Sequence, residues 1–337
     1  MGRVVGVGVV GLGRIGIVHS EIFALRVEGA KLVAVCDVVE SRAKSVGEKY
    51  NVKWYTDYSK MLEDERVEAV VICTPTYLHV DMIIDAVKAG KHILVEKPMT
   101  LTVSEAKRVL EATSKSNIVF QVGYMRRFDY SYSEAKKAID EGRIGKPIFV
   151  SAISRDPAPP PGWVADPKLS GGLLLDLMSH DFDAVRWLMG SEVVEVYAYG
   201  EAYIYSEVKA KGDLDCATVF LKFSNGATGV VHGSRKSVYG YDIRTEILGT
   251  DGTLFIGSSF NPEFALGSKH GVTFKGYPWF QERFYSAYVE EDKHFIKCIL
   301  EGRKPLVSVV DGLRAVQIAE AAWNSIKSGK PVRIQLD

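Results

Sequence analysis

A glycine-rich turn near the start of the chain has the spacing of a dinucleotide-binding loop. It follows an apolar, strand-like segment and opens a helical pattern. The residues expected to hold a cofactor there are Gly11, Gly13, Arg14, Ile15 and Gly16. Glycines at this spacing permit a tight turn and let a pyrophosphate approach the backbone at a helix N-terminus.

The acidic residue that should complete this motif is Asp37, at the end of the next apolar segment. A carboxylate about twenty residues beyond the loop accepts hydrogen bonds from the ribose hydroxyls of an adenosine. It also repels the additional phosphate of NADP, so the sequence favours NAD over NADP. Arg42 could reach such a phosphate, but we expect it on the solvated face of a helix. A plain glycine turn followed by a strand-end acid is the simpler alternative.

A lysine stands at the end of a later apolar segment, within Glu96-Lys97-Pro98. Ligands of open parallel sheets gather outside the carboxyl ends of the strands, so we expect Lys97 beside the nicotinamide. Its ammonium can donate a hydrogen bond to a substrate oxygen, and a partly buried lysine can have a lowered pKa. The alternative is a lysine that points into water.

An aspartate and a histidine share a helical segment in the second half of the chain. Asp176 and His180 lie within a helix predicted over residues 173–190, and their i,i+4 spacing places both on one face. A neutral imidazole can take the proton of a hydroxyl near pH 7, and a carboxylate can orient that ring. The alternatives are a core histidine among solvated acids and a metal site. No second His or Cys stands at a matching spacing, so we expect no bound metal.

The N-terminal third of the chain alternates short apolar segments with helical patterns. Strands are predicted at 4–13 (where the strand runs into the glycine loop), 31–38, 52–57, 69–75, 92–98 and 118–124. Helices are predicted at 16–27, 40–50, 79–90 and 102–116. Continuous apolar strands that alternate with helices indicate a parallel sheet buried on both faces, with right-handed crossovers. Residues 1–122 are therefore predicted to form a doubly wound Rossmann domain that binds NAD.

Further along the chain the pattern changes to long strands with alternating polarity. The dipeptides Asn225-Gly226 and Asp251-Gly252 are strong hairpin signals between them. The remaining predicted helices lie at 284–302 and 312–329. Residues 123–337 are therefore predicted to form a substrate-binding and oligomerisation domain of the α+β type, with a large, mostly antiparallel open sheet. The chain as a whole belongs to the α/β class.

The composition excludes several classes of partner. Lys plus Arg and Asp plus Glu each number 42 among 337 residues, so the formal charge is zero and gives no electrostatic footprint for a nucleic acid. No apolar run reaches the roughly eighteen residues of a membrane span. The four cysteines lack the spacing of a metal site, and Cys36 and Cys73 are expected to be buried. We therefore expect a cytoplasmic protein that binds neither nucleic acid nor membrane.

Four motifs together resemble one family of oxidoreductases. GLGRIG, the EKP tripeptide, GYMRRFD (123–129) and GGLLLDLMSHDFD (171–183) resemble the Gfo/Idh/MocA family, and the resemblance extends over essentially the whole chain. The MRR and YGYD segments are most similar to its inositol dehydrogenase branch. The resemblance implies NAD-dependent oxidation of one secondary hydroxyl of a cyclic polyol. The first expectation is conversion of myo-inositol to 2-keto-myo-inositol.

The resemblance also implies catalytic and substrate-binding roles. Lys97, Asp176 and His180 match the catalytic group of the family, with His180 as general base. The residues expected to line the polyol pocket are Met125, Arg126, Ser154, Asp156, Trp163, Asp176, His180 and Tyr241. Some inositol dehydrogenases carry His and Asn where this chain has Ser154 and Asp156, so the preferred stereoisomer stays open.

Several residues at strand ends are expected to contact the cofactor in addition to the glycine loop. They are Asp37, Thr74, Pro75, His79, Glu96 and Lys97. A structural role is the alternative for His79. His19 could also touch the cofactor, but we expect it to be structural. The histidines expected to be structural are His92, His232, His270 and His294.

The proline-rich segment 154–172 is expected to lack regular structure. Its neighbours Asp156 and Asp176 place it over the mouth of the expected pocket. Residues 156–170 could therefore form a stiff lid on which Trp163 excludes water from the reaction. The alternative is an ordinary surface loop made rigid by proline.

Members of the family are commonly tetramers that associate through the open face of the second-domain sheet. The alternating Tyr197, Tyr199, Tyr203 and Tyr205 fit such an interface, although they fit a core as well. The resemblance therefore implies a homo-oligomer, either a tetramer or a dimer. It also implies that the protein binds a small cyclitol or sugar as its substrate.

Two other functions stay open on the sequence. The first is a dehydrogenase of a pyranose or anhydrosugar with the same mechanism, because Ser154, Asp156 and the proline-rich segment decide the shape of the pocket. The second is a non-catalytic regulator that senses NAD and a sugar, a role that the family also includes. A sensor need not retain a proton-handling group, so the presence of Lys97 and His180 weighs against it.

Overall fold

The computed structural model describes residues 2–258, 261–269 and 271–336, so His270 lies outside the described residues. Its contacts divide the chain into two compact units. The first comprises residues 1–128 and 286–313, and the second comprises residues 129–285 and 314–337. The predicted domain limits, 1–122 and 123–337, stay a prediction. In the structure, residues 286–313 make most of their contacts with the N-terminal unit.

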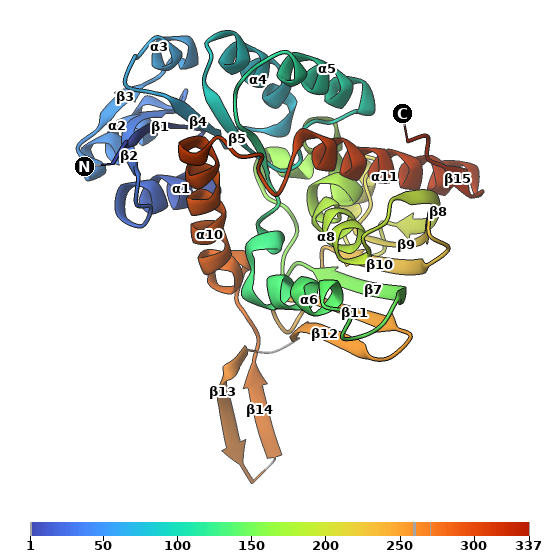
Figure 1. The fold of residues 1–337 in the computed structure, drawn as a ribbon. Helices are drawn as coiled ribbons and strands as arrows, with labels where there is room; N and C mark the ends of the chain where they lie inside the picture. Colours follow the sequence, from blue (N-terminus) through green and yellow to red (C-terminus); the bar gives the residue numbers. More distant parts are fainter. Residues whose placement is uncertain (1, 259–260, 270, 337) are drawn as a thin grey trace. The chain divides into compact units, whose positions relative to one another are not determined.

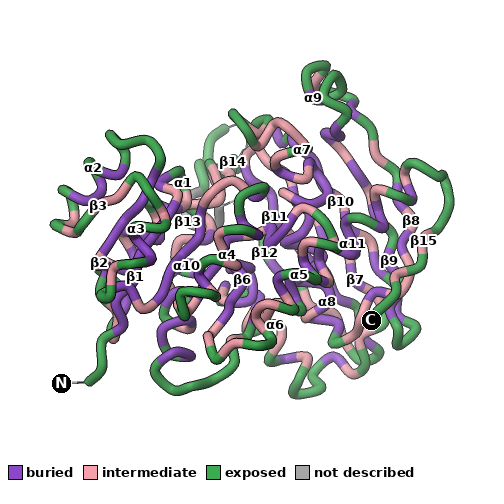
Figure 2. Tube along the Cα trace, turned by 90° about the horizontal axis from the view of Figure 1, so that it is seen from above, coloured by how far each residue is buried: buried purple, intermediate pink, exposed green. Residues whose placement is uncertain are grey.

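The sheet of the first unit is parallel throughout its described strands (Figure 1). In spatial order these strands are β3 (Lys53–Tyr55), β2 (Ala30–Cys36), β1 (Val5–Val10), β4 (Ala69–Ile72), β5 (His92–Glu96) and β6 (Phe120–Gly123). β1 and β4 are buried along their whole length, as Figure 2 shows for β1, because both faces of the sheet are covered. The strand order and direction confirm the predicted doubly wound Rossmann fold.

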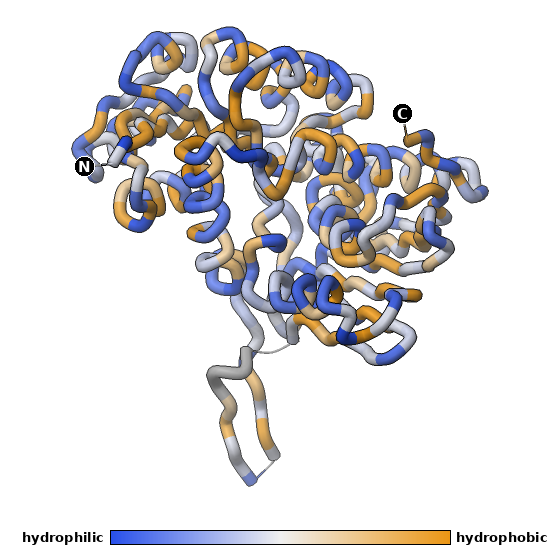
Figure 3. The backbone as a smooth tube through the Cα atoms, viewed as in Figure 1, coloured by the Kyte–Doolittle hydropathy of each residue, from blue (hydrophilic) through white to orange (hydrophobic). Residues whose placement is uncertain are grey.

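Helices cover both faces of this sheet. They are α1 (Arg14–Leu25), α2 (Glu40–Tyr50), α3 (Tyr58–Leu62), α4 (His79–Lys88), α5 (Val103–Ser114) and the part of α10 (Phe280–Glu301) that belongs to this unit. α4 and α5 pack together on one face, and α1 and α10 lie together on the other (Figure 1). Figure 3 shows hydrophobic and hydrophilic residues interspersed along α4 and α5, as expected for amphipathic helices on a sheet. Thr102 and Glu105 form a capping box that fixes the start of α5.

The large sheet of the second unit is mostly antiparallel. Its described strands, in spatial order, are β12 (Thr253–Ser258), β11 (Asp242–Gly249), β7 (Pro147–Arg155), β10 (Thr228–Ser234), β9 (Cys216–Phe223), β8 (Val193–Glu201) and β15 (Val332–Arg333). β7 and β10 are the parallel pair. Asn225-Gly226 connects β9 to β10 and Asp251-Gly252 connects β11 to β12, so both predicted hairpins are confirmed.

One face of this sheet is covered by helices and the other is open. The helices of the unit include α6 (Tyr130–Asp140), α8 (Ser179–Met189), α9 (Ser206–Ala210) and the adjoining parts of α10 and α11 (Val309–Ser328). α8 packs on β7, and buried side chains alternate along the strands with exposed ones such as Tyr199, Phe220 and Phe255. No helix in the described part of the chain has the combined length and apolar character that a membrane crossing requires.

The segment 173–190 differs from the single α-helix predicted for it. Leu173–Leu177 form a π-helical turn, in which the Met178 N–H donates to the Leu173 carbonyl at 3.1 Å, and α8 begins only at Ser179. Four leucines in this turn are buried. A single apolar face of an α-helix cannot hold four neighbouring leucines, whereas the wider π turn directs all of them into the core. The i,i+4 argument for Asp176 and His180 therefore does not hold, because the two residues lie in different helical geometries.

Other segments also differ from the prediction, and the helices α3, α6 and α9 were not predicted. The proline-rich segment contains a 3-10 turn at Gly162–Ala165 and a short helix, α7 (Pro167–Ser170). Pro167 starts α7, where a missing N–H costs no hydrogen bond. A two-stranded hairpin of β13 (Asn261–Ser268) and β14 (Gly271–Lys275), which was not predicted, projects as an arm between β12 and α10 (Figure 1).

The turn between β1 and α1 leaves no room for a side chain at two of its glycines. Gly11 has a φ of +86°, and a Cβ there would lie 2.7 Å from the Cys73 carbonyl oxygen. A Cβ on Gly16 would lie 1.9 Å from the Gly11 carbonyl oxygen. By contrast, no described atom lies within 4 Å of the place that a Cβ on Gly13 would take. The loop is therefore packed tightly on its inner side and open at Gly13.

Gly16→Ala should destabilise the protein, because α1 would have to move away from the loop to admit the methyl group. We expect a loss of about 1–3 kcal/mol in the free energy of unfolding. Gly13→Ala is the matched control, and its cost at the helix start, where Ala is a poorer N-cap than Gly, should be smaller, at most about 1 kcal/mol. Urea and thermal unfolding compare the two variants. Equal stabilities would contradict the packing described for this turn.

Candidate cofactor and substrate site

The carboxyl edge of the parallel sheet collects most of the predicted cofactor residues. Because the strands run in one direction, the segments that follow them emerge at the same edge. The glycine loop follows β1, Asp37 follows β2, Thr74 and Pro75 follow β4, and Lys97 follows β5. The strand order reverses between β1 and β4, which is where doubly wound sheets bind a dinucleotide.

Asp37 is fixed beside the glycine loop by two hydrogen bonds. Its Oδ2 accepts from the Leu12 N–H at 2.7 Å, and its Oδ1 accepts from the Val39 N–H at 2.8 Å. Each oxygen keeps a second lone pair that a ribose hydroxyl can use. Among the described residues no side chain caps α1 at Gly13, and a helix N-terminus without a side-chain cap suits a pyrophosphate. The donor set therefore fits NAD.

His79 joins the loops that follow β4 and β5. Its Nε2 lies 2.9 Å from the Thr74 carbonyl oxygen, and its Nδ1 lies 3.0 Å from the Pro98 carbonyl oxygen. The ring is buried, and this burial lowers the pKa of His79, so it is neutral at pH 7 and donates to one of the two carbonyl oxygens. These contacts give His79 a structural role at the sheet edge, while its contact with the cofactor stays a prediction.

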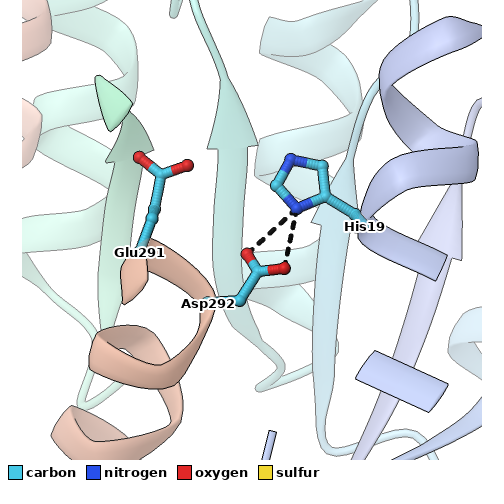
Figure 4. Close-up of side chains that lie close together, drawn as sticks. All are labelled: His19, Glu291 and Asp292. Atoms are coloured by element: carbon cyan, nitrogen blue, oxygen red, sulfur yellow. Dashed lines mark hydrogen bonds and ion pairs between the residues drawn. The ribbon is translucent and has the colours of Figure 1, made fainter. Parts of the chain in front are cut away.

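A buried histidine and two acids lie behind the same edge. His19 on α1 contacts Asp292 on α10 through Nδ1, at 2.9 and 3.0 Å from the two carboxylate oxygens (Figure 4). Its Nε2 lies 3.1 Å from Oε1 of Glu96, the last residue of β5. The side chains of His19 and Asp292 are completely buried and that of Glu96 nearly so. Glu96 was predicted at the cofactor, whereas the structure engages its side chain with His19.

Two members of this cluster, His19 and Asp292, together with Glu291 form the one group of potential metal ligands found among the described residues. Ligand atoms of His19, Glu291 and Asp292 lie within 4.8 Å of one another. Burial lowers the pKa of His19, but the Asp292 and Glu96 carboxylates together outweigh this effect, so its pKa lies well above 6.5. Burial raises the pKa of Asp292 to about 6. At neutral pH the ring is therefore charged and offers a metal no lone pair, so the cluster fits a held proton better than an ion.

The turn after β6 carries Met125 and Arg126, both buried. The neighbouring Arg127 anchors this turn within the first unit. Its Nη2 lies 2.8 Å from Asp311 Oδ1, and its Nη1 donates to the Leu306 carbonyl at 3.0 Å. The structure thus fixes the backbone that presents the two predicted substrate residues.

In the second unit an arginine joins two of the predicted substrate residues. Arg235, which directly follows β10 and is buried, lies 3.2 Å from Asp156 Oδ2 and 2.8 Å from Asp176 Oδ2. Asp213 lies nearby and accepts the Leu173 N–H at the start of the π turn at 3.1 Å. Burial raises the pKa of Asp213, although Arg235 opposes this. Arg235 therefore holds the segment of Asp156 and the turn of Asp176 together.

Ser154 on β7 and His180 on α8 are both buried. The Ser154 hydroxyl donates to Asp181 Oδ1 at 2.9 Å, and Asp181 directly follows His180 in the first turn of α8. Ser154 therefore bonds to the helix that carries the predicted base. Its contact with a substrate stays a prediction.

Tyr241 and Trp163 differ strongly in exposure. Tyr241 is 4% exposed, its N–H donates to the Tyr277 carbonyl at 2.8 Å, and its ring contacts Trp279 and Phe284. Trp163 is 38% exposed and lies in the 3-10 turn of the proline-rich segment. An exposed tryptophan on a short turn suits the predicted lid, which stays a prediction.

Arg235 and Asp292 were missed in the sequence analysis. Asp292 did have a signal, because it falls on the apolar face of the predicted helix 284–302, in register with the buried Tyr288 and Phe295. A charged residue on an apolar face needs a buried partner. Arg235 follows an alternating strand and offers no comparable signal, because an arginine at a strand end is ordinarily solvated.

Known proteins match the chain over nearly its full length. A scyllo-inositol 2-dehydrogenase (NAD(+)) of Bacillus subtilis is 41% identical over 329 residues, which cover 97% of this chain and 96% of that protein. A myo-inositol 2-dehydrogenase of Thermotoga maritima is 39% identical over 332 residues, which cover 98% of each chain. The crystal structure of scyllo-inositol dehydrogenase from Lactobacillus casei with bound NAD(H) and scyllo-inositol has a TM-score of 0.91 and 30% identity, and covers 98% of this chain and 99% of that one.

Two family matches follow the two sheets of the structure. Residues 5–124 match the oxidoreductase family with an NAD-binding Rossmann fold. Residues 132–255 match the Gfo/Idh/MocA C-terminal domain. Together with the relatives, these matches show that the chain belongs to the Gfo/Idh/MocA oxidoreductase family.

Proposed function

We propose that this protein oxidises one secondary hydroxyl of an inositol to a ketone with NAD. The observation that carries the proposal is the carboxyl edge of the parallel sheet. It joins an uncapped helix start behind an open Gly13, the fixed Asp37 carboxylate and Lys97 after β5. The matched relatives are named for inositol oxidation, and one of their structures contains NAD(H) and an inositol.

Three residues are proposed to handle the proton of the reacting hydroxyl. Bound NAD⁺ supplies the acceptor for the hydride that leaves the carbinol carbon. His180 takes the hydroxyl proton as general base, and Lys97 donates a hydrogen bond to the oxygen as it becomes a carbonyl. Asp176, which Arg235 holds, is proposed to stabilise the protonated imidazole. The products are a ketone, the reduced cofactor and one proton, so atoms and electrons balance.

The preferred stereoisomer is proposed to be myo-inositol, which gives 2-keto-myo-inositol. The relatives at 41% and 39% identity are named for scyllo- and myo-inositol respectively, so both isomers belong in the first assay. Met125, Arg126, Ser154, Asp156 and Tyr241 are proposed to shape the pocket. The fixed Asp37 carboxylate is proposed to select NAD over NADP.

The protein is also proposed to form a homo-oligomer, a tetramer or a dimer, through the open face of the second sheet. Tyr199 is 57% exposed, Phe220 48% and Phe255 77%, and strand register places Tyr197 opposite Phe220 on this face. Large apolar side chains exposed on one face mark an interaction surface. All four cysteines are free thiols, which supports a cytoplasmic location for the enzyme.

Lys97→Met and His180→Ala should each lower kcat with myo- or scyllo-inositol by roughly 10²–10⁴-fold, because each removes acid–base chemistry. Steady-state NADH formation measures the effect, and circular dichroism checks the fold. Lys60→Met, on an exposed lysine of α3, is the matched control and should keep wild-type turnover. Wild-type protein that forms no NADH with either isomer would contradict the proposed function.

Arg235→Met should destabilise the second unit, because it leaves two carboxylates facing each other without their cation. We expect a loss of about 3–5 kcal/mol in the free energy of unfolding. Arg66→Met breaks a similar pair with Asp64 on the surface, 2.6 Å between Nη2 and Oδ2, and should cost at most about 1 kcal/mol. Urea unfolding of both variants provides the comparison. An Arg235→Met protein as stable as the Arg66→Met protein would show that the two acids do not depend on Arg235.

Phe220→Glu should break the proposed oligomer, because it places a charge at the centre of the open sheet face. Light scattering after size-exclusion chromatography should report a smaller mass than for the wild type. Tyr130→Glu is the control, since Tyr130 is 78% exposed on α6 and lies outside this face. A wild-type protein that is already monomeric would contradict the proposed oligomer.

A further inference from the structure

The buried histidine of the first unit connects three elements around the cofactor edge. His19 lies on α1, the helix that starts at the glycine loop. Its two ring nitrogens contact Asp292 on α10 and Glu96 at the end of β5. The ring of Tyr288, also on α10, lies edge-on to the imidazole at 5.7 Å between centroids. The histidine is thus held from three sides and cannot change its orientation without breaking a contact.

Both ring nitrogens of His19 must donate to satisfy these contacts. A neutral imidazole has one donor and one acceptor, whereas a carboxylate only accepts. Asp292 lies 2.9 Å from Nδ1 and Glu96 lies 3.1 Å from Nε2, so an imidazolium between two carboxylates satisfies every partner. Figure 4 shows both contacts to Asp292 leaving the same ring nitrogen.

Glu96 connects the position of the His19 ring to the backbone of the next residue, Lys97. Its Oε1 faces His19 Nε2, while its Oε2 accepts the backbone N–H of Lys97 at 3.1 Å. A continuous path of hydrogen bonds therefore runs from Asp292 through His19 and Glu96 to the backbone of the predicted catalytic lysine. The path links α10, α1 and the end of β5 within one compact unit.

Stability alone does not require such a cluster. Taking three charges out of water is costly, and apolar side chains of similar volume commonly stabilise a core at least as well. What the charged cluster adds is direction, because its hydrogen bonds fix where each group points. We propose that His19 is a positioning residue: by donating hydrogen bonds to Asp292 and Glu96, it fixes the turn that carries Lys97. This role rests on the dehydrogenase function proposed above.

Two substitutions separate the two hydrogen bonds of the ring. The amide of Gln reaches about as far as Nε2, and that of Asn about as far as Nδ1. His19→Gln therefore keeps a donor toward Glu96, and His19→Asn keeps a donor toward Asp292. Each variant loses one charge-assisted bond, so similar losses of stability are expected. A merely structural histidine would make the two variants equally active.

The readouts are kcat, KM and the Kd for NAD. We expect His19→Asn to lower kcat by about 10²-fold, as when a reacting group is displaced by about 1 Å, with KM and the Kd for NAD little changed. His19→Gln should retain most of the wild-type kcat. Equal kcat values for the two variants, or a kcat that only follows the melting temperature, would overturn the proposal.

Glu96→Leu provides a test if the His19 variants do not fold. A leucine side chain accepts neither from His19 Nε2 nor from the Lys97 N–H, whereas a Gln amide satisfies both by donating to a neutral imidazole. The His19–Asp292 pair remains in this variant. A fall in kcat with KM little changed would support the proposal, and a wild-type kcat would overturn it. The wild-type assay distinguishes the two proposals. If the wild type is active and the variants keep its kcat, only the positioning role is wrong. If the wild type is inactive, the proposed function is wrong.

Discussion

The six strands of the first sheet run in one direction, so the segments that follow them along the chain all begin at the same edge of the sheet. That edge works only if the glycine loop can pack against the strand ends. Gly11 touches the backbone after β4, and Gly16 touches Gly11, so helix α1 begins close to the sheet. The open helix start, the fixed Asp37 and the Lys97 turn all depend on this approach.

The two compact units use the same device to direct polar groups. In the first, His19 lies between Glu96 and Asp292; in the second, Arg235 lies between Asp156 and Asp176. Each is a buried cation flanked by two carboxylates. Such a cation leaves neither acid without a partner and gives both a fixed direction. In both units a proposed catalytic residue belongs to the cluster or directly follows it.

Local patterns predicted much of the fold. Apolar runs located the parallel strands, glycine spacing located the cofactor loop, and Asn-Gly and Asp-Gly dipeptides located two hairpins. The π turn was missed, because its leucines read equally well as an α-helix and only packing distinguishes the two geometries. The contact between His19 and Asp292 spans 273 positions, and no local spacing indicates it. Arg235 was missed for the same reason, since its acids are distant in sequence.

The substrate residues are the part for which sequence is least informative. Ser154 bonds to Asp181 and Asp156 to Arg235, so each side chain already has a partner within the second unit. The oxygens of Ser154 and Asp156 can bind a polyol only through the lone pairs that these internal hydrogen bonds leave unused. This distribution of hydrogen bonds, rather than the catalytic group, should decide which inositol is preferred.

The decisive measurement is a crystal structure of the protein with NAD and myo-inositol. We expect Lys97 Nζ and a ring nitrogen of His180 both to lie within hydrogen-bond distance of one hydroxyl oxygen, whose carbon faces C4 of the nicotinamide. A complex in which Lys97 and His180 contact different parts of the ligand, or in which neither contacts the hydroxyl nearest C4, would contradict this expectation.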